Sequence, residues 1–393
     1  MVAQKIRVGL VFGGRSGEHE VSLRSARSIL DALDRERYEP VLIGIDHDGR
    51  WHLQQSALAL LDAPGTPLAL DPAAPALAVA PGGDASPGSL VQTSLAAVGA
   101  APRGALHAAT AAASPRGVGQ VDVFFPVLHG TYGEDGTLQG LMEMVGVPYV
   151  GSGVLGSAAG MDKDVAKRLL RDAGLPVVDG FSLRASQDVP VEEITRRVET
   201  SFGWPVFVKP ANMGSSVGVS RVKGPGELPG ALATAFRYDG KLLVEQGLAV
   251  REVECAVLGN EHPEASVVGE IVPSHDFYSY EAKYLDEHGA ALVIPADLPA
   301  GRSDEIRAMA VRAFQCLELS GLARVDFFIE KGSGRVYVNE VNTLPGFTTI
   351  SMYPKLWAAT GLSYGALVDR LIALALERHQ ARQALSTRYV PGV

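Results

Sequence analysis

Cysteine, long apolar runs and clustered basic residues are all scarce in this 393-residue sequence. The two cysteines, Cys255 and Cys316, lie far apart inside apolar runs, which favours core thiols in a reducing compartment over a disulfide or a metal pair. No stretch approaches the roughly 18 apolar residues that span a membrane, and the first apolar run lacks the length of a signal peptide. The net charge of -9, with Lys and Arg scattered, argues against nucleic acid as a partner.

Apolar residues nevertheless make up 47% of the chain, which is enough for two or three domains with separate cores. The first part of the sequence alternates between continuous apolar runs and segments with helical spacing. This order predicts a Rossmann-like α/β layer with parallel strands. The predicted elements are strands at residues 6–12, 39–45 and 121–128, helices at 22–33 and 136–145, and a short strand ending at Val150.

Two stretches rich in small residues are better explained by structure than by chemistry. Residues 57–119 are dominated by Ala, Pro and Gly with almost no charge, which predicts a partly disordered insertion that builds no packed core. Residues 151–156 match the GxGxxG pattern of dinucleotide-binding proteins, but no strand ending in an acidic residue follows at about 20 residues. A turn from a strand into a helix explains these glycines more simply, and the next helix, 164–173, ends at Gly174.

A lysine-bearing strand followed by a Gly/Ser loop is the first candidate nucleotide site. Residues 205–210 form an apolar strand that carries Lys209, residues 212–218 form a loop of small residues, and residues 219–222 return as a strand. Such a loop offers backbone N–H groups and hydroxyls to phosphates, and the lysine adds a positive charge. No Gly-Lys-Ser/Thr opens a helix here, so this is not a Walker A motif. A plain hairpin with a snorkelling lysine stays the alternative.

The most informative stretch contains two opposed carboxylates. Residues 323–330 and 335–341 are predicted strands, and the glycines of Gly332-Ser333-Gly334 suit the positive φ of a hairpin loop. Opposed carboxylates destabilise a strand pair unless a cation lies between them, and oxygen ligands of this kind suit Mg²⁺ that bridges phosphates. A solvated hairpin face is the alternative from these strands alone. The loop predicts two opposed pairs, Asp326 with Glu340 and Arg324 with Asn342.

Eight segments, in this order, resemble the ATP-grasp enzymes and more narrowly the D-alanine–D-alanine ligases. They are GGRSGEHEVS, LHGTYGEDGTLQG, MDKDVAK, VKPANMGSSVGVS, VEQGLAVREVECAVLG, FYSYEAKY, ARVDFF and NEVNTLPGFTTISMYP. The resemblance covers most of the chain outside residues 57–119. It implies a mixed α/β and α+β fold, in which a Rossmann-like N-terminal domain (1–150) precedes a two-part ATP-grasp fold. The two parts are a central lid domain (151–240) and a C-terminal domain (241–393) with a mobile loop at about 274–294.

The resemblance implies ATP-dependent ligation of two D-alanines through a D-alanyl phosphate, for peptidoglycan precursors. The implied cofactors are ATP and two Mg²⁺ ions, with Mn²⁺ as a substitute. It also implies a cytoplasmic homodimer joined through the N-terminal domain, with no nucleic-acid or membrane partner. The implied metal ligands are Asp326, Glu340 and Asn342. The implied nucleotide-binding residues are Lys163, Lys209, Gly214, Ser215, Ser216, Val217, Glu245, Gln246, Leu248, Glu252, Lys283 and Phe328.

Substrate recognition and catalysis are also carried over from the family, residue by residue. Glu18, Ser215 and Tyr284 would form a hydrogen-bonded triad, in which Glu18 pairs with the ammonium of the first D-alanine. Arg324 and the backbone N–H of Gly346 would form the oxyanion hole. For His129 a satisfied residue at a strand end is the alternative, and for Glu252 a solvated side chain. The implied substrate-binding residues are Glu18, His129, Ser351 and Met352, and Ser351 is also expected to be catalytic.

Three other functions remain as alternatives. A D-alanine–D-lactate or D-serine ligase is one, although Tyr284 in the EAKY segment favours an amine nucleophile over a hydroxyl. Another ATP-grasp carboxylate–amine ligase would share Lys209 and the metal ligands, but would give no reason for Glu18. A catalytically silent nucleotide-binding or scaffolding protein would tolerate the loss of Arg324, which is present.

Overall fold

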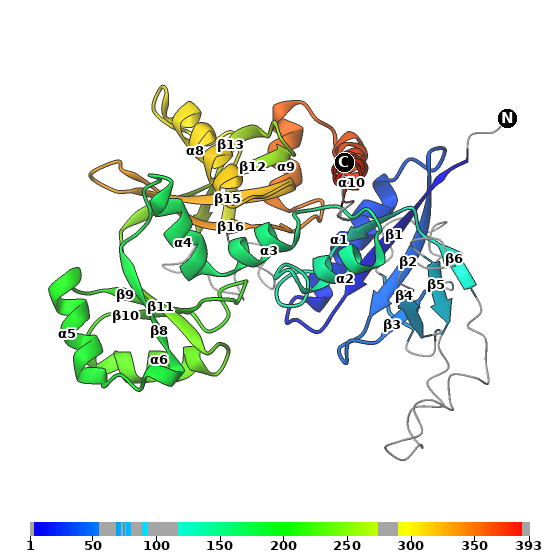
Figure 1. Ribbon diagram of the computed structural model, residues 1–393. Helices are drawn as coiled ribbons and strands as arrows, with labels where there is room; N and C mark the ends of the chain where they lie inside the picture. Colours follow the sequence, from blue (N-terminus) through cyan, green and yellow to red (C-terminus); the bar gives the residue numbers. More distant parts are fainter. Residues whose placement is uncertain are drawn as a thin grey trace, which may run out of the picture.

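The computed structural model describes residues 4–54, 68–71, 74, 76–79, 89–92, 117–273 and 290–386, and these residues form four sheets in three lobes (Figure 1). Among the predicted site residues, Lys283 and Tyr284 lie outside the described residues, as does most of the predicted loop at 274–294. The N-terminal sheet is mainly parallel and the other sheets are antiparallel, as the expected mix of α/β and α+β requires.

The N-terminal lobe is built on a sheet with the strand order three, two, one, seven. Its elements are β1 (Ile6–Gly13), α1 (His19–Ala32), β2 (Tyr38–Ile45), β3 (Trp51–Leu53), β7 (Val123–Pro126) and α2 (Thr137–Val145). The apolar strand β1 lies between β2 and β7 and pairs with both in parallel. A central strand buried on both faces needs such a continuous apolar run, so the predicted Rossmann-like layer is confirmed.

A small antiparallel sheet lies largely inside the segment predicted to be a partly disordered insertion. Its strands are β4 (Leu77–Val79), β5 (Ser89–Gln92) and β6 (Gly117–Gln120). Leu68 and Leu77 are buried in the cores of the N-terminal lobe, with exposed fractions of 3% and 8%. The prediction that this segment builds no core is therefore wrong for its described parts. Leucines interspersed among Ala and Pro supply enough apolar surface to pack.

Two consecutive helices, α3 (Val154–Met161) and α4 (Lys163–Asp172), follow the N-terminal lobe. Gly151 has a φ of 103° in the turn before α3, and a Cβ at Gly156 would lie 2.5 Å from the backbone oxygen of Glu318. The glycines therefore serve a turn and close packing, which confirms the structural explanation of the GxGxxG pattern. The Asp162 carboxylate accepts from two backbone N–H groups at the start of α4 and caps that helix.

The central lobe carries the predicted strand–loop–strand unit. Its elements are β8 (Gly180–Arg184), α5 (Val191–Ser201), β9 (Val206–Pro210), β10 (Ser220–Val222), α6 (Leu228–Phe236) and β11 (Lys241–Gln246), with short 3₁₀ turns at Ala185–Gln187 and Pro225–Glu227. Its antiparallel sheet has the order β10-β9-β11-β8. The sheet of this lobe therefore extends through β11, past the boundary predicted at residue 240.

The C-terminal lobe holds the predicted hairpin. Its elements are β12 (Val250–Gly259), β13 (Glu264–Pro273), β14 (Ala290–Val293), α8 (Arg302–Cys316), β15 (Gly321–Glu330), β16 (Val336–Asn342), α9 (Met352–Thr360) and α10 (Tyr364–Gln383). The sheet order is β14-β13-β12-β15-β16. Gly332 and Gly334 have φ of 96° and 68°, as predicted for the loop. The register confirms both opposed pairs, Asp326 with Glu340 and Arg324 with Asn342.

One hydrophobic core joins the N-terminal and C-terminal lobes. It runs from Leu10 and Leu30, on β1 and α1, to Tyr353 and Leu371, on α9 and α10. Figure 1 shows α10 beside α1 at this junction. Because the two lobes share a packed core, the loop before α1 and the residues that begin α9 are held in a fixed relation.

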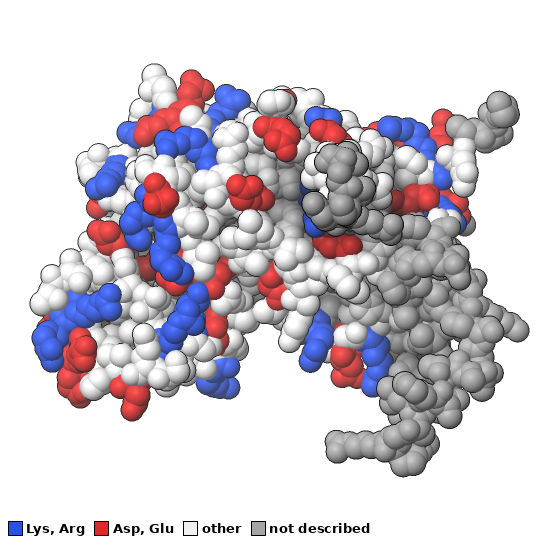
Figure 2. All heavy atoms as spheres, in the orientation of Figure 1, with Lys and Arg blue, Asp and Glu red and all other residues white. Residues whose placement is uncertain are grey.

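The described residues also settle two expectations from composition. Cys255 is buried and Cys316 is half-buried, and both thiols are free. Burial raises the pKa of Cys255 to about 12, as expected for a core thiol. No single helix in the described part is long and apolar enough to cross a membrane, while α9 and α10 together pass that test but bend by 102°. Basic and acidic side chains are interspersed over the face in Figure 2.

Candidate active site

A cavity of about 2120 Å³ lies where the three lobes meet. Among the predicted site residues that the structure describes, only Val217 is absent from its walls, although the neighbouring Ser216 lines it. The structure thus brings together residues from segments more than 300 positions apart. The predicted residues that line the cavity are Glu18, His129, Lys163, Lys209, Gly214, Ser215, Ser216, Glu245, Gln246, Leu248, Glu252, Arg324, Asp326, Phe328, Glu340, Asn342, Gly346, Ser351 and Met352.

On the hairpin, Arg324 rather than a second acid is the partner of Asp326. Its Nε and Nη2 each donate to Asp326 at 2.7 Å, and Nε lies 2.9 Å from Oε2 of Glu254. Asn342 Nδ2 also donates to Asp326, at 2.9 Å. Burial alone would lower the pKa of Arg324, but Asp326 and Glu254 outweigh it and raise that pKa well above its ordinary value. Arg324 is therefore a fixed cation at the cavity wall.

The residues present fit the Mg²⁺ that the resemblance implies. Glu340 and Asn342 alternate along β16 and so face the same side of the sheet, and Asp326 lies opposite Glu340 on β15. Two carboxylates and one amide oxygen form the hard donor set that Mg²⁺ prefers, with room in the cavity for phosphate oxygens to complete it. These three residues would hold the metal.

Lys163 contacts both the β15–β16 hairpin and the Gly/Ser loop at residues 212–218 (the phosphate loop). Its ammonium donates to the backbone oxygen of Met213 at 2.8 Å and lies 3.5 Å from Oε2 of Glu340. The residue is the first of α4, and its helix is fixed by the Asp162 cap. A cation between a carboxylate and a small-residue loop is well placed for a phosphate group.

The phosphate loop contacts the N-terminal lobe directly. Ser215 and Ser216 have φ of 51° and 60°, in the left-handed region that non-glycine residues rarely adopt. The hydroxyl of Ser215 donates to the Glu18 carboxylate, so two members of the predicted triad meet. A Cβ on Gly214 would lie 3.1 Å from Oε2 of Glu18, which explains a glycine there. Tyr284, the third member, lies outside the described residues.

Glu245 lies between two lysines, one of which the sequence did not single out. Lys209 Nζ is 2.5 Å from Oε2 of Glu245, and Lys167 Nζ is 2.6 Å from Oε1. Burial alone would raise the pKa of Glu245, but Lys167 and Lys209 hold it below its ordinary value. Burial lowers the pKa of Lys167 to about 8, against the attraction of Glu245. The MDKDVAK segment contained Lys167, but only the fold shows which carboxylate it meets.

Sequence reasoning missed Glu134 as well as Lys167, and Glu134 lines the cavity. Its two carboxylate oxygens accept from the backbone N–H groups of Gly130, at 2.7 Å, and Leu344, at 2.9 Å. Burial, aided by the Glu18 charge, raises its pKa to about 8. Glu134 therefore links the loop after β7 to the loop after β16. Its position in the LHGTYGEDGTLQG segment was the available signal.

His129 makes the same link with its imidazole. Nδ1 donates to the backbone oxygen of Leu344 at 2.9 Å, and Nε2 is 3.3 Å from the Ser25 hydroxyl. Burial lowers the pKa of His129, despite the nearby Glu18, so the ring is neutral. The alternative of a satisfied histidine at a strand end thus describes its hydrogen bonds, and the ring also lines the cavity.

The start of α9 forms the far end of the cavity. The hydroxyl of Ser351 accepts from the backbone N–H of Thr348 at 3.0 Å, and Ser351 precedes Met352, the first helical residue. Backbone N–H groups at a helix start attract carboxylates. A Cβ on Gly346 would lie 3.0 Å from the Ser351 hydroxyl, so a glycine leaves this part of the wall open.

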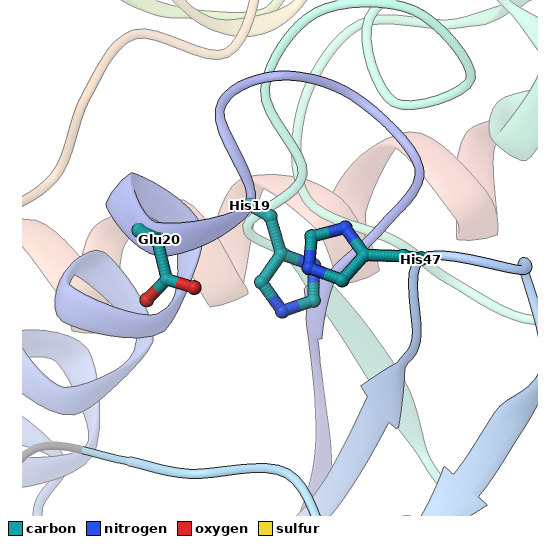
Figure 3. Close-up of side chains that lie close together, drawn as sticks. All are labelled: His19, Glu20 and His47. Atoms are coloured by element: carbon teal, nitrogen blue, oxygen red, sulfur yellow. The ribbon is translucent and has the colours of Figure 1, made fainter.

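Outside the cavity, one cluster of His19, Glu20 and His47 has donor atoms close enough for a metal (Figure 3). The two imidazole rings are stacked, with centroids 3.9 Å apart and planes at 25°. Lone pairs of stacked rings lie in their ring planes and do not converge on one ion. His19 also begins α1, where the helix dipole repels cations. We therefore assign no metal to this cluster.

Comparison with known proteins identifies relatives over the whole chain. A family model described as D-ala D-ala ligase N-terminus matches residues 7–152, and one described as D-ala D-ala ligase C-terminus matches residues 169–373. The D-alanine--D-alanine ligase A of Chromobacterium violaceum is 54% identical over 384 residues, covering 97% of this chain and 98% of that protein. That of Escherichia coli strain K12 is 49% identical over 385 residues, covering 98% and 99%.

Solved structures that resemble this chain point to the same family. The D-alanine-D-alanine ligase from Coxiella burnetii has a TM-score of 0.79 and 37% identity, with 97% of each chain covered. The VanG D-Ala:D-Ser ligase from Enterococcus faecalis has a TM-score of 0.77 and 32% identity, covering 95% of this chain and 100% of that one. The chain belongs to the D-alanine–D-alanine ligase family and has the ATP-grasp fold that its motifs predicted.

Proposed function

We propose that this chain joins two D-alanines, with ATP, into D-alanyl-D-alanine through a D-alanyl phosphate, for peptidoglycan precursors. The contact that carries the proposal is between Ser215 and Glu18, because it joins a phosphate loop to an amino-acid-binding loop at one cavity. Family membership supports both the ATP dependence and the amide-forming reaction. The D-alanine carboxylate attacks the γ-phosphorus of ATP, which forms the acyl phosphate and releases ADP. The amine of the second D-alanine then attacks the acyl carbon, and phosphate and a proton are released.

The chain's own residues bind and orient the reactants. Glu18 pairs with the ammonium of the first D-alanine, and the N–H groups at the start of α9 bind the carboxylate of the second. Holding both substrates in this way turns a bimolecular step into an intramolecular one. Arg324, fixed by Asp326 and Glu254, and the N–H of Gly346 stabilise the oxyanion of the tetrahedral intermediate.

Lysines and metal would neutralise the negative charge of the phosphates. Lys163 and Lys209 would bind the phosphates, and Asp326, Glu340 and Asn342 would hold two Mg²⁺ ions, for which Mn²⁺ would substitute. Bound metal supplies charge neutralisation, which lets a carboxylate approach the γ-phosphate. The loop predicted at 274–294 ends in β14, so its C-terminal part belongs to the C-terminal sheet, and residues 274–289, with Lys283 and Tyr284, lie outside the described residues. Exclusion of water from the acyl phosphate stays the role proposed for this segment.

A D-serine or D-lactate ligase is the second candidate. The observation that favours it is the likeness to the D-Ala:D-Ser ligase, at 32% identity. The likeness to D-alanine--D-alanine ligase A is greater, at 54%. Tyr284 in the EAKY segment favours an amine nucleophile, so D-alanine stays the proposed second substrate.

We also propose a homodimer through the N-terminal lobe. Helices α2 and α3 lie against each other and present exposed apolar side chains, among them Met144 at 80%, Leu155 at 67% and Val154 at 41% exposed. A monomer rarely leaves such a patch in water. Sedimentation measures the molecular mass in solution of the wild type and of M144E. We expect a wild-type dimer that M144E weakens, and a wild-type monomer would contradict the proposal. The cytoplasmic location stays a prediction.

One assay tests the activity. Purified protein is incubated with ATP, Mg²⁺ and a panel of D-amino and D-hydroxy acids, and product masses and phosphate release are measured. We expect D-alanyl-D-alanine as the main product, and no product after chelation of the metal. A depsipeptide or a D-alanyl-D-serine product would favour the second candidate. Phosphate release with no condensation product would contradict both.

A further inference from the structure

Lys167 is a buried cation that the proposed reaction leaves without a role. Lys167 lies on α4 and is 4% exposed, while Glu245 and Lys209 are 3% and 8% exposed. The Lys167 ammonium forms an ion pair with Glu245, 2.6 Å from Oε1, and among the described residues neither of these two atoms has an aligned hydrogen bond. A charge buried to this degree is costly unless it is paired, so this contact needs an explanation.

The two lysines differ in their access to the cavity. Glu245 and Lys209 both line it, on neighbouring strands β11 and β9, whereas Lys167 approaches Glu245 from α4 and does not reach the cavity wall. A ligand in the cavity can therefore displace Lys209 from Oε2 of Glu245 but cannot displace Lys167 from Oε1. Glu245 therefore has one cation that a ligand can displace, Lys209, and one that it cannot displace, Lys167.

We propose that Lys167 is the positioning residue of the adenine site: it holds the Glu245 carboxylate oriented and ionised while Lys209 leaves Glu245 for a phosphate. This inference rests on the proposed function and assigns the adenine amino group to Glu245, one of the nucleotide-binding residues that the resemblance implies. The exocyclic amino group of adenine donates, and an ionised carboxylate accepts only. Oε2, vacated by Lys209, receives the adenine N–H, and Oε1 keeps the Lys167 ammonium.

Lys167 matters most when nucleotide is bound. If Lys167 is absent, the departure of Lys209 leaves Glu245 buried without a cation. The carboxyl group then either takes up a proton or retains Lys209, and in both cases the adenine ring or the phosphate loses a partner. Lys167 acts through Glu245 and touches neither substrate nor nucleotide.

The test compares nucleotide bases in the K167M variant. Hydrogen bonds to charged groups translate to a loss of about 10- to 100-fold in affinity, so we expect the Kd for ATP to rise by that factor. Inosine triphosphate has a carbonyl in place of the amino group, and its Kd should change by less than about threefold. The preference for ATP over inosine triphosphate should therefore fall by at least about threefold. Equal weakening of both nucleotides, or an unchanged ATP Kd, would overturn the proposal.

K241M is the matched control. Lys241 is also buried, and its ammonium pairs with Asp162, the cap of the same helix α4, but Lys241 does not line the cavity. K241M should therefore lower the melting temperature as K167M does, with the ATP preference kept. A loss of the ATP preference in K241M would show that any disturbance of α4 suffices, and would overturn a specific role for Lys167.

K167Q keeps the test decisive if K167M does not fold, and a double variant tests whether Lys167 acts through Glu245. K167Q keeps a donor for Glu245 without a charge and should show an ATP Kd between those of wild type and K167M; a wild-type base preference in K167Q counts against the proposal. In an E245Q background, K167M should change the ATP Kd by less than about threefold, because a residue that acts through Glu245 is not additive with it. A further tenfold loss there would overturn the proposal. Absence of ligase activity in the wild-type enzyme would instead contradict the proposed function.

Discussion

Replacing Arg324 by methionine tests the catalytic hairpin most directly, because it removes charge while keeping a long apolar stem. Arg324 forms one bidentate pair of hydrogen bonds with Asp326 and a contact with Glu254, and the side chains of Asp326 and Glu254 are 13% and 7% exposed. Removing one partner of a buried ion pair costs about 3–5 kcal/mol. Because Asn342 still donates to Asp326, we expect the lower end, about 3 kcal/mol of unfolding free energy.

The expected loss of activity is larger than the loss of stability explains. Removing one oxyanion donor lowers kcat by about 10²- to 10³-fold, so R324M should show this loss at saturating ATP and D-alanine. Arg378 provides the control: it is half-buried and donates to Ser320 Oγ at 2.9 Å, outside the cavity walls. R378M should destabilise the fold with kcat nearly unchanged. Urea unfolding and phosphate release measure both quantities, and an R324M kcat within about tenfold of wild type would refute the oxyanion role.

Three other predictions follow from the same structure. E340Q removes a metal ligand and should lower ATP-dependent phosphate release by at least about 100-fold with the circular dichroism spectrum unchanged; near-normal turnover would contradict the metal assignment. Burial raises the pKa of Glu134 from 4.5 to about 8, so its contribution to stability is complete below pH 4.5 and is lost as pH rises through about 8. Urea unfolding should show stability falling across that window in wild type and less steeply in E134Q, whereas equal slopes count against the shift. Deleting residues 82–116 removes β5, with both of its strand pairings, so we expect a lower melting temperature but a kcat within about twofold; a tenfold loss of kcat would show that the segment supports the site.

Local patterns in the sequence were sufficient where neighbouring residues decide the structure. The apolar run of β1 and the glycines at 332 and 334 predicted a parallel strand and a hairpin whose register places Asp326 opposite Glu340. In both cases the determining contacts lie within one strand or one turn. The β4–β5–β6 sheet was missed for the opposite reason, because its strands are short and separated by long Ala/Pro-rich segments, so no single window shows a strand pattern.

Site residues were missed where their partner is distant in sequence. Glu134 accepts from the backbone N–H of Leu344, 210 positions away, and a backbone group carries no sequence signal. Lys167 meets Glu245 only because α4 packs beside β11. The family resemblance supplied roles for side chains that touch the reactants, and it could not supply those that act through another residue.

The described ion pairs indicate that metal and nucleotide depend on each other for binding in the cavity. Three carboxylates expected to meet metal or nucleotide have a cation from the chain: Asp326 has Arg324, Glu340 has Lys163, and Glu245 has Lys209. These pairs compensate buried charge that would otherwise destabilise the site. At Glu340, bound metal would replace Lys163, and the phosphates would pair with the freed lysine. At Glu245, the adenine amino group would replace Lys209 while Lys167 stays. Metal without phosphate would leave Lys163 unpaired, and phosphate without metal would draw Lys163 away from Glu340. We therefore expect Mg²⁺ and ATP to bind with positive coupling, each lowering the Kd of the other by the same factor.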